Sequence, residues 1–283
     1  MRPFTQVDVF SAVPGLGNAL AVVHDAEGLD DSAMQAFARW TNLSETTFLL
    51  PPTDPAADYR VRIFTTSTEL PFAGHPTLGS AHAWLEAGGV PAREDVVVQE
   101  CGVGLVEVRR GERLAFAAPP LVRSGDVDEE TLAQVLAASQ VRREDVVGAA
   151  WVDNGPGWVA AELVSAEAVL AARVDQAHTA GLKWGLVGRW ADPAAAGKDV
   201  EVRGFFDGGE GAWEDPVTGS LNAGLAQWLI GSGRLPPSYV AGQGHALHRD
   251  GRVHVDTDGP DRIWVGGDVV TVVSGSVDLD PRS

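Results

Sequence analysis

Hydrophobic and polar residues alternate with a period of two over many short stretches, which predicts a chain rich in short strands. In the first half these stretches are 5–10, 19–24, 46–50, 59–64, 96–100, 105–109 and 113–117. In the second half they are 146–152, 157–163, 200–205, 246–249, 252–256 and 269–273. Two further segments, 31–40 and 166–172, are expected to form helices. Strands and helices that do not alternate regularly are typical of an α+β fold.

Two other segments are apolar on nearly every side, and each is expected to form a buried helix. They begin near Pro76 and Pro216, because proline suits the first position of a helix, and they end near Gly88 and Gly231. The first turn of a helix carries unpaired N–H groups and a partial positive charge, so it favours anions. Two such helix starts facing one cleft would bind an anionic substrate.

The chain contains an apparent internal repeat with an offset of 140 residues. Residues 75–80 (HPTLGS) match 215–220 (DPVTGS). The glycine pairs 15/17 and 102/104 match glycines 140 residues later, and Arg109 with Gly111 matches Arg249 with Gly251. We therefore expect two similar halves, 1–118 and 119–283, with the boundary near Pro119. The last strand, 269–273, has no counterpart and can complete a sheet in either half. The predicted active site lies between the two halves.

Composition and charge exclude several classes of protein. The formal net charge is −18, from 39 acidic and 21 basic side chains, so nucleic acid is not an expected partner. Cys101 is the single cysteine, which excludes an intrachain disulfide and a multi-thiolate zinc site. No histidine pair has a third ligand nearby, so no metal is predicted. The N-terminus reads as a strand, and no apolar run is long enough for a membrane span. We expect a cytoplasmic protein with no membrane association.

The candidate chemistry lies at the two predicted helix starts. Asp215 has an ordinary interpretation as a helix N-cap. His75 occupies the matching position in the other copy, and histidine is a poor N-cap, so a functional role explains it better. Ser220 is either an ordinary first-turn serine or a substrate ligand, and its mate Ser80 in the first copy weakens the second interpretation.

Glu45 lies between a predicted helix and a predicted strand, in the segment 42–47 (NLSETT). The composition of this segment alone favours an ordinary interpretation of Glu45, as a glutamate in a solvent-exposed loop. A carboxylate that is partly buried has another use, because burial shifts its pKa toward working pH and allows it to carry a proton.

Four segments together resemble the PhzF family of phenazine-biosynthesis-like proteins: 7–10 (VDVF), 39–46 (RWTNLSET), 69–77 (ELPFAGHPT) and 214–220 (EDPVTGS). The resemblance covers nearly the whole chain. It implies a diaminopimelate-epimerase-like fold with two pseudo-symmetric halves, each a barrel-like sheet around a central helix. It also implies a homodimer without a metal or organic cofactor.

The resemblance also implies roles for individual residues. Glu45 would move the proton, with His75 and Asp215 as the other catalytic residues. Ser44, Gly74, Gly219 and Ser220 would bind the substrate, the two glycines through their N–H groups. Related two-thiol racemases carry a cysteine at each helix start, where this chain has His75 and Asp215, so two-thiol racemisation is excluded.

We therefore predict a cofactor-independent isomerase that shuttles a proton within a small carboxylate metabolite. The alternative is a non-catalytic protein that binds a small molecule on the same scaffold, since a fold does not fix a function. Hydrogen exchange from D₂O into the ligand distinguishes the two, because a binder incorporates no deuterium.

Overall fold

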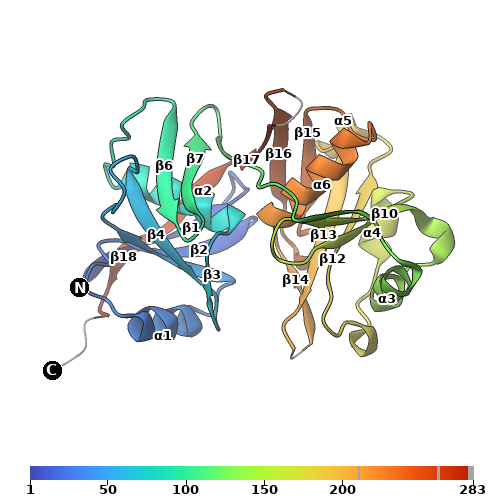
Figure 1. The fold of residues 1–283 in the computed structure, drawn as a ribbon, viewed down its shortest axis with the longest axis horizontal. Helices are drawn as coiled ribbons and strands as arrows, with labels where there is room; N and C mark the ends of the chain where they lie inside the picture. The colour runs from blue at the N-terminus through green and yellow to red at the C-terminus, as the bar shows by residue number, and fades with distance from the viewer. Residues whose placement is uncertain (210, 260–261, 280–283) are drawn as a thin grey trace. The chain divides into compact units, whose positions relative to one another are not determined.

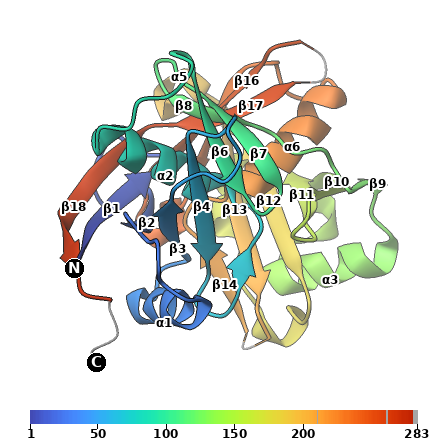
Figure 2. The same ribbon diagram turned by 60° about the vertical axis from the view of Figure 1, so that its left-hand side comes forward.

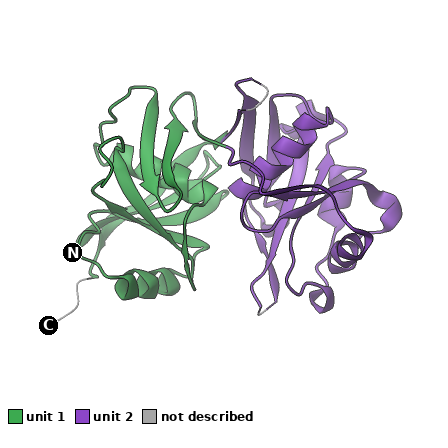
Figure 3. Cartoon of the chain, viewed as in Figure 1, with its two compact units in different colours: residues 1–117, 266–283 green, residues 118–265 purple. Residues whose placement is uncertain are grey.

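A computed structural model describes residues 1–209, 211–259 and 262–279 of this chain. The chain divides into two compact units, 1–117 with 266–283 and 118–265 (Figure 3). Both units combine strands with helices, so the chain has the mixed α+β fold that the sequence predicts (Figure 1). None of the helices among the described residues is both long enough and apolar enough to cross a membrane.

The sheet of unit 1 combines strands from two distant parts of the sequence. Its elements are β1 (Arg2–Val9), β2 (Asn18–Val23), α1 (Asp31–Thr41), β3 (Glu45–Leu50), β4 (Tyr59–Phe64), β5 (Glu69–Leu70), α2 (Gly74–Glu86), β6 (Val96–Cys101), β7 (Gly104–Arg109), β8 (Leu114–Ala117) and β18 (Val269–Val277). Strand β18 pairs antiparallel with β1, and Figure 2 shows the two side by side. The C-terminal strand therefore completes the sheet of the first half.

Unit 2 contains β9 (Arg123–Asp126), α3 (Glu129–Ser139), β10 (Val146–Asp153), β11 (Val159–Leu163), α4 (Ala166–Ala171), β12 (Lys183–Arg189), α5 (Pro193–Ala196), β13 (Val200–Asp207), β14 (Ala212–Asp215), α6 (Gly219–Gly231), β15 (Tyr239–Gln243) and β16 (Gly251–Thr257). Strand β17 (Ile263–Gly267) crosses the boundary between the units. Short 3₁₀ helices form at Arg143–Asp145, Gln176–His178 and His245–Leu247. The strand predicted at 246–249 is therefore wrong: Gly244 has φ +92°, and the chain turns there into the third 3₁₀ helix.

Each unit has a buried apolar helix on one face of its strands and amphipathic helices on the other. In unit 1, α2 contacts β1, β2, β3 and β8, while α1 covers a core of Val23, Phe37, Phe48 and Phe64. In unit 2, α6 contacts β10 and β16, while α3 and α4 cover a core that includes Trp184 and Phe205. The apolar sequences of α2 and α6 follow from this burial.

The offset of 140 residues between the halves is wrong for these helices. Helix α2 begins at Gly74 and α6 at Gly219, a difference of 145. Gly79 and Gly224, also 145 apart, both lie against strands, because an added Cβ would meet the Leu20 side chain at 2.5 Å in one case and the Val152 carbonyl oxygen at 2.2 Å in the other. The predicted helix starts are shifted accordingly: Pro76 is the third residue of α2, and Pro216 precedes α6 by three residues.

Candidate active site

In unit 1, strand β3 and helix α2 bring Glu45 and His75 together. Glu45 is the first residue of β3, and His75 is the second residue of α2. The Nε2 atom of His75 lies 3.4 Å from Oε2 of Glu45, and the two side chains are only 6% and 14% exposed. Two of the three predicted catalytic residues are thus neighbours in a largely buried environment.

Burial determines the charge state of His75. Desolvation lowers the pKa of its imidazole from the ordinary 6.5 to about 3, because little water is left to solvate a cation there. The ring is therefore neutral near pH 7. A neutral ring beside Glu45 can donate or accept one hydrogen bond without adding a positive charge to the pair.

The first turn of α2 is suited to an anion. Its N-cap is Ala73, which offers no side-chain cap, and Pro76 carries no N–H, so the turn begins with the N–H groups of Gly74 and His75. Gly74 is buried, whereas Ser44, immediately before Glu45, is exposed. Ser44 directly precedes Glu45 and Gly74 directly precedes His75 in the sequence, and substrate binding by these two residues stays a prediction.

Buried side-chain hydrogen bonds hold helix α2 in place. The amide of Gln99 donates to Thr77 Oγ1 over 3.0 Å and accepts from the Tyr59 hydroxyl over 2.9 Å. Ser80 Oγ donates to Thr47 Oγ1 over 2.9 Å. Ser80 therefore has a structural role in the middle of the helix.

In unit 2, Asp215 lies at the end of β14, four residues before α6 begins. The N-cap of α6 is Thr218, so the N-cap interpretation of Asp215 is wrong. Asp215 is buried, and its Oδ2 accepts a 2.6 Å hydrogen bond from Thr218 Oγ1. Asp215 thus stands beside the helix start without capping it.

Gln243 holds the start of α6 in place, a role that the sequence did not assign to it. Its Oε1 accepts from Thr218 N and Asn222 Nδ2, and its Nε2 donates to Thr218 Oγ1 and to the Asp215 carbonyl. All four bonds are buried. Gln99 and Gln243 therefore perform the same task in the two units, each binding a threonine in or next to the first turn of the apolar helix.

Ser220, the second residue of α6, is oriented by two residues that sequence reasoning missed. Trp158 Nε1 donates to Ser220 Oγ over 3.0 Å, and Asn154 Nδ2 donates to the Ser220 carbonyl over 2.8 Å. Because the hydroxyl oxygen already accepts from the indole, its own proton is directed to another acceptor. Trp158 is separated from Ser220 by 62 residues, so no local sequence pattern signals this contact.

The two apolar helices and the short strands before them show which residues of the two units correspond. Strand β5 ends at Leu70, four residues before α2 begins, and β14 ends at Asp215, four residues before α6 begins. The matching segments are therefore 69–75 (ELPFAGH) and 214–220 (EDPVTGS). His75 corresponds to Ser220 and Asp215 to Leu70, which corrects the equation of His75 with Asp215 and of Ser80 with Ser220.

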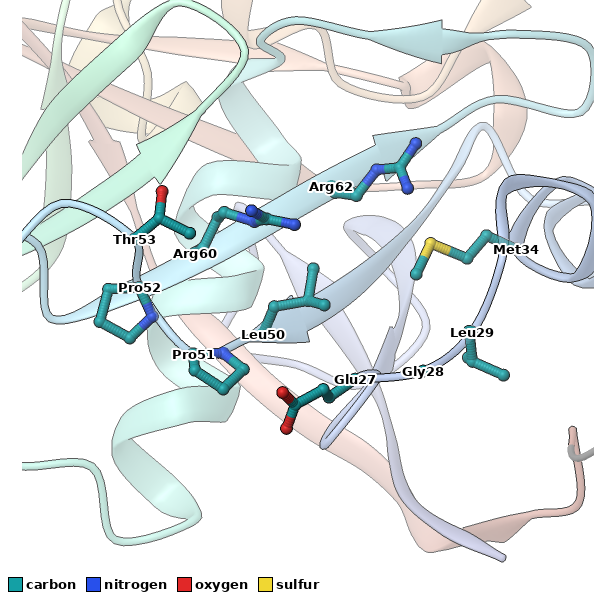
Figure 4. Close-up of a pocket in the computed structure, with 10 residues that line it drawn as sticks. All are labelled: Glu27, Gly28, Leu29, Met34, Leu50, Pro51, Pro52, Thr53, Arg60 and Arg62. Atoms are coloured by element: carbon teal, nitrogen blue, oxygen red, sulfur yellow. The ribbon is translucent and has the colours of Figure 1, made fainter.

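The pocket in Figure 4 lies elsewhere in unit 1. It has a volume of about 440 Å³, and none of the predicted site residues lines it. Its lining comes from 27–29, Met34, 50–53, Arg60 and Arg62, and Arg62 is already paired with Asp31 and Glu69. The pocket is therefore separate from the candidate catalytic residues.

Comparison with known proteins agrees with the fold and identifies the family of this chain. A protein of fission yeast, Schizosaccharomyces pombe, named antisense-enhancing sequence 1 is 33% identical over 96% of this chain and 97% of its own. A trans-2,3-dihydro-3-hydroxyanthranilate isomerase of Pseudomonas aeruginosa is 31% identical over 92% of this chain and 91% of its own. A solved structure of a predicted epimerase from the same bacterium is 29% identical, covers 98% of this chain and 99% of its own, and has a TM-score of 0.78.

Fold and relatives place the chain among isomerases and epimerases, the enzyme class that the sequence predicted. The model of the PhzC-PhzF family, phenazine biosynthesis-like protein, matches residues 7–275. The chain belongs to this family, as the resemblance of its motifs indicated.

Proposed function

We propose that this protein is an isomerase that moves a proton within a small carboxylate substrate, with Glu45 as the proton carrier. Glu45 takes a proton from an activated carbon and returns it to another carbon of the same molecule. The step changes the position of a double bond and of a hydrogen, and it needs no external oxidant or reductant. The contact between Glu45 and the buried, neutral His75 carries this proposal.

The environment of Glu45 supports a base rather than a structural ion-pair partner. A protonated histidine at 3.4 Å would hold the carboxylate charged, but His75 is neutral because of its burial. The 3.4 Å separation is also longer than a normal hydrogen bond, as is common for catalytic groups before substrate binds. The contact with His75 therefore does not by itself hold Glu45 in the charged form.

The starts of α2 and α6 support a carboxylate as the substrate group. Neither helix has a side-chain cap, and each begins with a buried glycine, Gly74 or Gly219, whose N–H group points along the helix axis. Ser220 adds a hydroxyl proton at the start of α6. We assign substrate binding to these groups and substrate orientation to Asp215.

The names of the relatives reduce the range of compounds to test as substrates. One of them acts on trans-2,3-dihydro-3-hydroxyanthranilate, so this compound is the first to test. We propose an unsaturated cyclic carboxylate of this size as the substrate class. The family resemblance also predicts a homodimer that uses no cofactor, and both stay predictions.

Exchange in D₂O tests the proposal. The purified protein is incubated with trans-2,3-dihydro-3-hydroxyanthranilate, and with ligands captured from the protein by native mass spectrometry, and deuterium uptake is followed by mass spectrometry. Wild type should produce an isomer carrying solvent deuterium, and Glu45→Gln should be slower by about 10²–10⁴-fold. The control Glu112→Gln changes a carboxylate that is 83% exposed. Exchange by Glu45→Gln at the wild-type rate would contradict the role of Glu45, and no exchange by wild type into any ligand would favour the non-catalytic binder.

A further inference from the structure

A row of large side chains crosses β12, β13 and β14 in unit 2. Lys183 pairs with Phe206, and Phe206 pairs with Trp213, each directly opposite the next in the strand register. Side chains directly opposite each other in a sheet lie on the same face, so these three form one row. The three strands lie side by side in Figure 1.

This row lies on the same face of the sheet as the start of α6. Gly185 and Gly204, two residues along their strands from Lys183 and Phe206, both face α6, because an added Cβ would meet Leu221 at 2.6 Å and Thr218 Oγ1 at 2.9 Å, respectively. Residues two apart on a strand share a face. Asp215, which pairs with Gly204, is two residues beyond Trp213 and so lies in the neighbouring row.

Aromatic contacts join the row to Ser220. Trp213 stacks on Phe206, with ring centroids 6.0 Å apart and an interplanar angle of 18°. Phe206 meets Trp158 edge to face at 4.6 Å, and the indole N–H of Trp158 binds Ser220 Oγ. Trp158 is fully buried, whereas Trp213 is 53% exposed. An aromatic surface thus extends from the proposed carboxylate-binding turn to solvent.

We propose that this row, with Trp213 at its exposed end, is a specificity-determining surface that binds the flat, unsaturated part of the substrate. An exposed indole can stack on a flat ligand, and the stacking of Trp213 on Phe206 holds its ring in a fixed orientation. The proposal rests on the proposed function, since it takes the substrate carboxylate to bind at the start of α6.

Lys183 adds a cation to this surface. It is partly buried at the first position of β12, in a chain with a net charge of −18. A cation in this position reduces repulsion between an anionic substrate and the acidic protein. Lys183 therefore favours anions in general, and the aromatic rings select flat ones among them.

Two acids of similar size test the selection. Benzoate is flat and cyclohexanecarboxylate is puckered, and their dissociation constants are measured by titration calorimetry with the full chain. Benzoate should bind wild type about threefold to tenfold more tightly, the range expected for one aromatic stacking contact. Trp213→Ala should abolish this preference, and Trp213→Phe should retain most of it. Titration with benzoate should also shift the indole N–H resonance of Trp213, which is assigned by its loss in Trp213→Phe.

A matched control is available in unit 1. Trp40 is 78% exposed and stacks on Phe37 at 5.7 Å with an interplanar angle of 18°, so Trp40→Ala removes a similar exposed indole that is outside the proposed surface. It should leave the preference unchanged. Equal affinities for the two acids in wild type, binding of neither acid, or a preference that persists in Trp213→Ala would each overturn the proposal. These measurements do not involve Glu45, so their failure is distinct from a failure of the exchange experiment.

Discussion

The imidazole of His75 is held 3.4 Å from the carboxylate of Glu45 in an environment that keeps it neutral. The burial of His75 lowers the free energy of unfolding in acid. In the unfolded chain His75 takes up a proton near pH 6.5, whereas in the folded protein it does so only near pH 3. The folded state therefore loses stability relative to the unfolded state as the pH falls below 6.5.

The pH dependence of unfolding reports this effect directly. Between pH 7 and 5.5 the free energy of unfolding of wild type should fall by about 1 kcal/mol more than that of His75→Gln, since each pH unit below 6.5 costs about 1.4 kcal/mol. Urea unfolding at several pH values measures the difference. The exposed His245, changed to Gln, is the control and should follow wild type. Parallel curves for wild type and His75→Gln would show that burial does not lower the pKa of His75 in the folded protein.

Trp158 should act on ligand affinity through Ser220. Trp158→Phe removes the indole donor to Ser220 Oγ, so the hydroxyl loses its fixed orientation, and benzoate should bind roughly threefold to tenfold more weakly. Trp184→Phe is a matched control, because Trp184 is equally buried and its indole also donates to a serine, Ser139, at 2.8 Å. Both variants should lose stability, but only Trp158→Phe should lose affinity. Equal affinities in the two variants would contradict a positioning role for Trp158.

The local sequence patterns predicted the individual strands and helices well, but they did not predict correctly which residues of the two halves correspond. Alternation of apolar residues marked strands such as β4 and β6 with bounds close to those observed, because each buries one face. The repeat was misaligned because Gly79-Ser80 in the middle of α2 resembles Gly219-Ser220 at the start of α6. The two glycines serve different purposes, close packing in one helix and a helix start in the other, and a sequence match cannot separate them.

The candidate residues could be chosen from sequence, but their surroundings could not. The motifs contain Glu45, His75, Asp215 and Ser220, whereas the charge state of His75 depends on burial by residues distant in sequence. The orientation of Ser220 likewise depends on Trp158, which directly precedes β11 and is 62 residues away in the sequence. Contacts of this kind arise only when the sheet forms, so no local spacing reveals them.

Two equivalent ion pairs should differ in their effect on stability. Arg203 binds Glu214 across the β13–β14 hairpin with both side chains below 9% exposed, and Arg62 binds Glu69 across β4–β5 with exposures of 21% and 41%. Glu214→Gln should lower the free energy of unfolding by about 3 kcal/mol, because it leaves a buried guanidinium without its charge partner. Glu69→Gln should cost less than about 1 kcal/mol, since water screens the pair and Arg62 keeps Asp31. Urea unfolding measures the loss of stability in each variant. Equal losses would mean that burial does not control the strength of these pairs.

The start of α6 should be sensitive to one methyl group on the strand beneath it. In Gly204→Ala the new Cβ would lie 2.9 Å from Thr218 Oγ1 and 3.0 Å from Leu221 Cδ2, so these two side chains are displaced. We expect the first turn of the helix to move with them, because Thr218 Oγ1 is fixed by hydrogen bonds to Asp215 and Gln243. We expect a stability loss of about 1–3 kcal/mol and weaker benzoate binding, because the N–H groups and Ser220 move with the turn. Gly231→Ala, at the last residue of the same helix, meets nothing within 4 Å and should be neutral or stabilising by up to about 1 kcal/mol, with unchanged affinity. Thermal unfolding and calorimetric titration of both variants measure the two effects. Unchanged benzoate affinity in Gly204→Ala, despite a loss of stability, would show that the start of α6 does not bind the carboxylate.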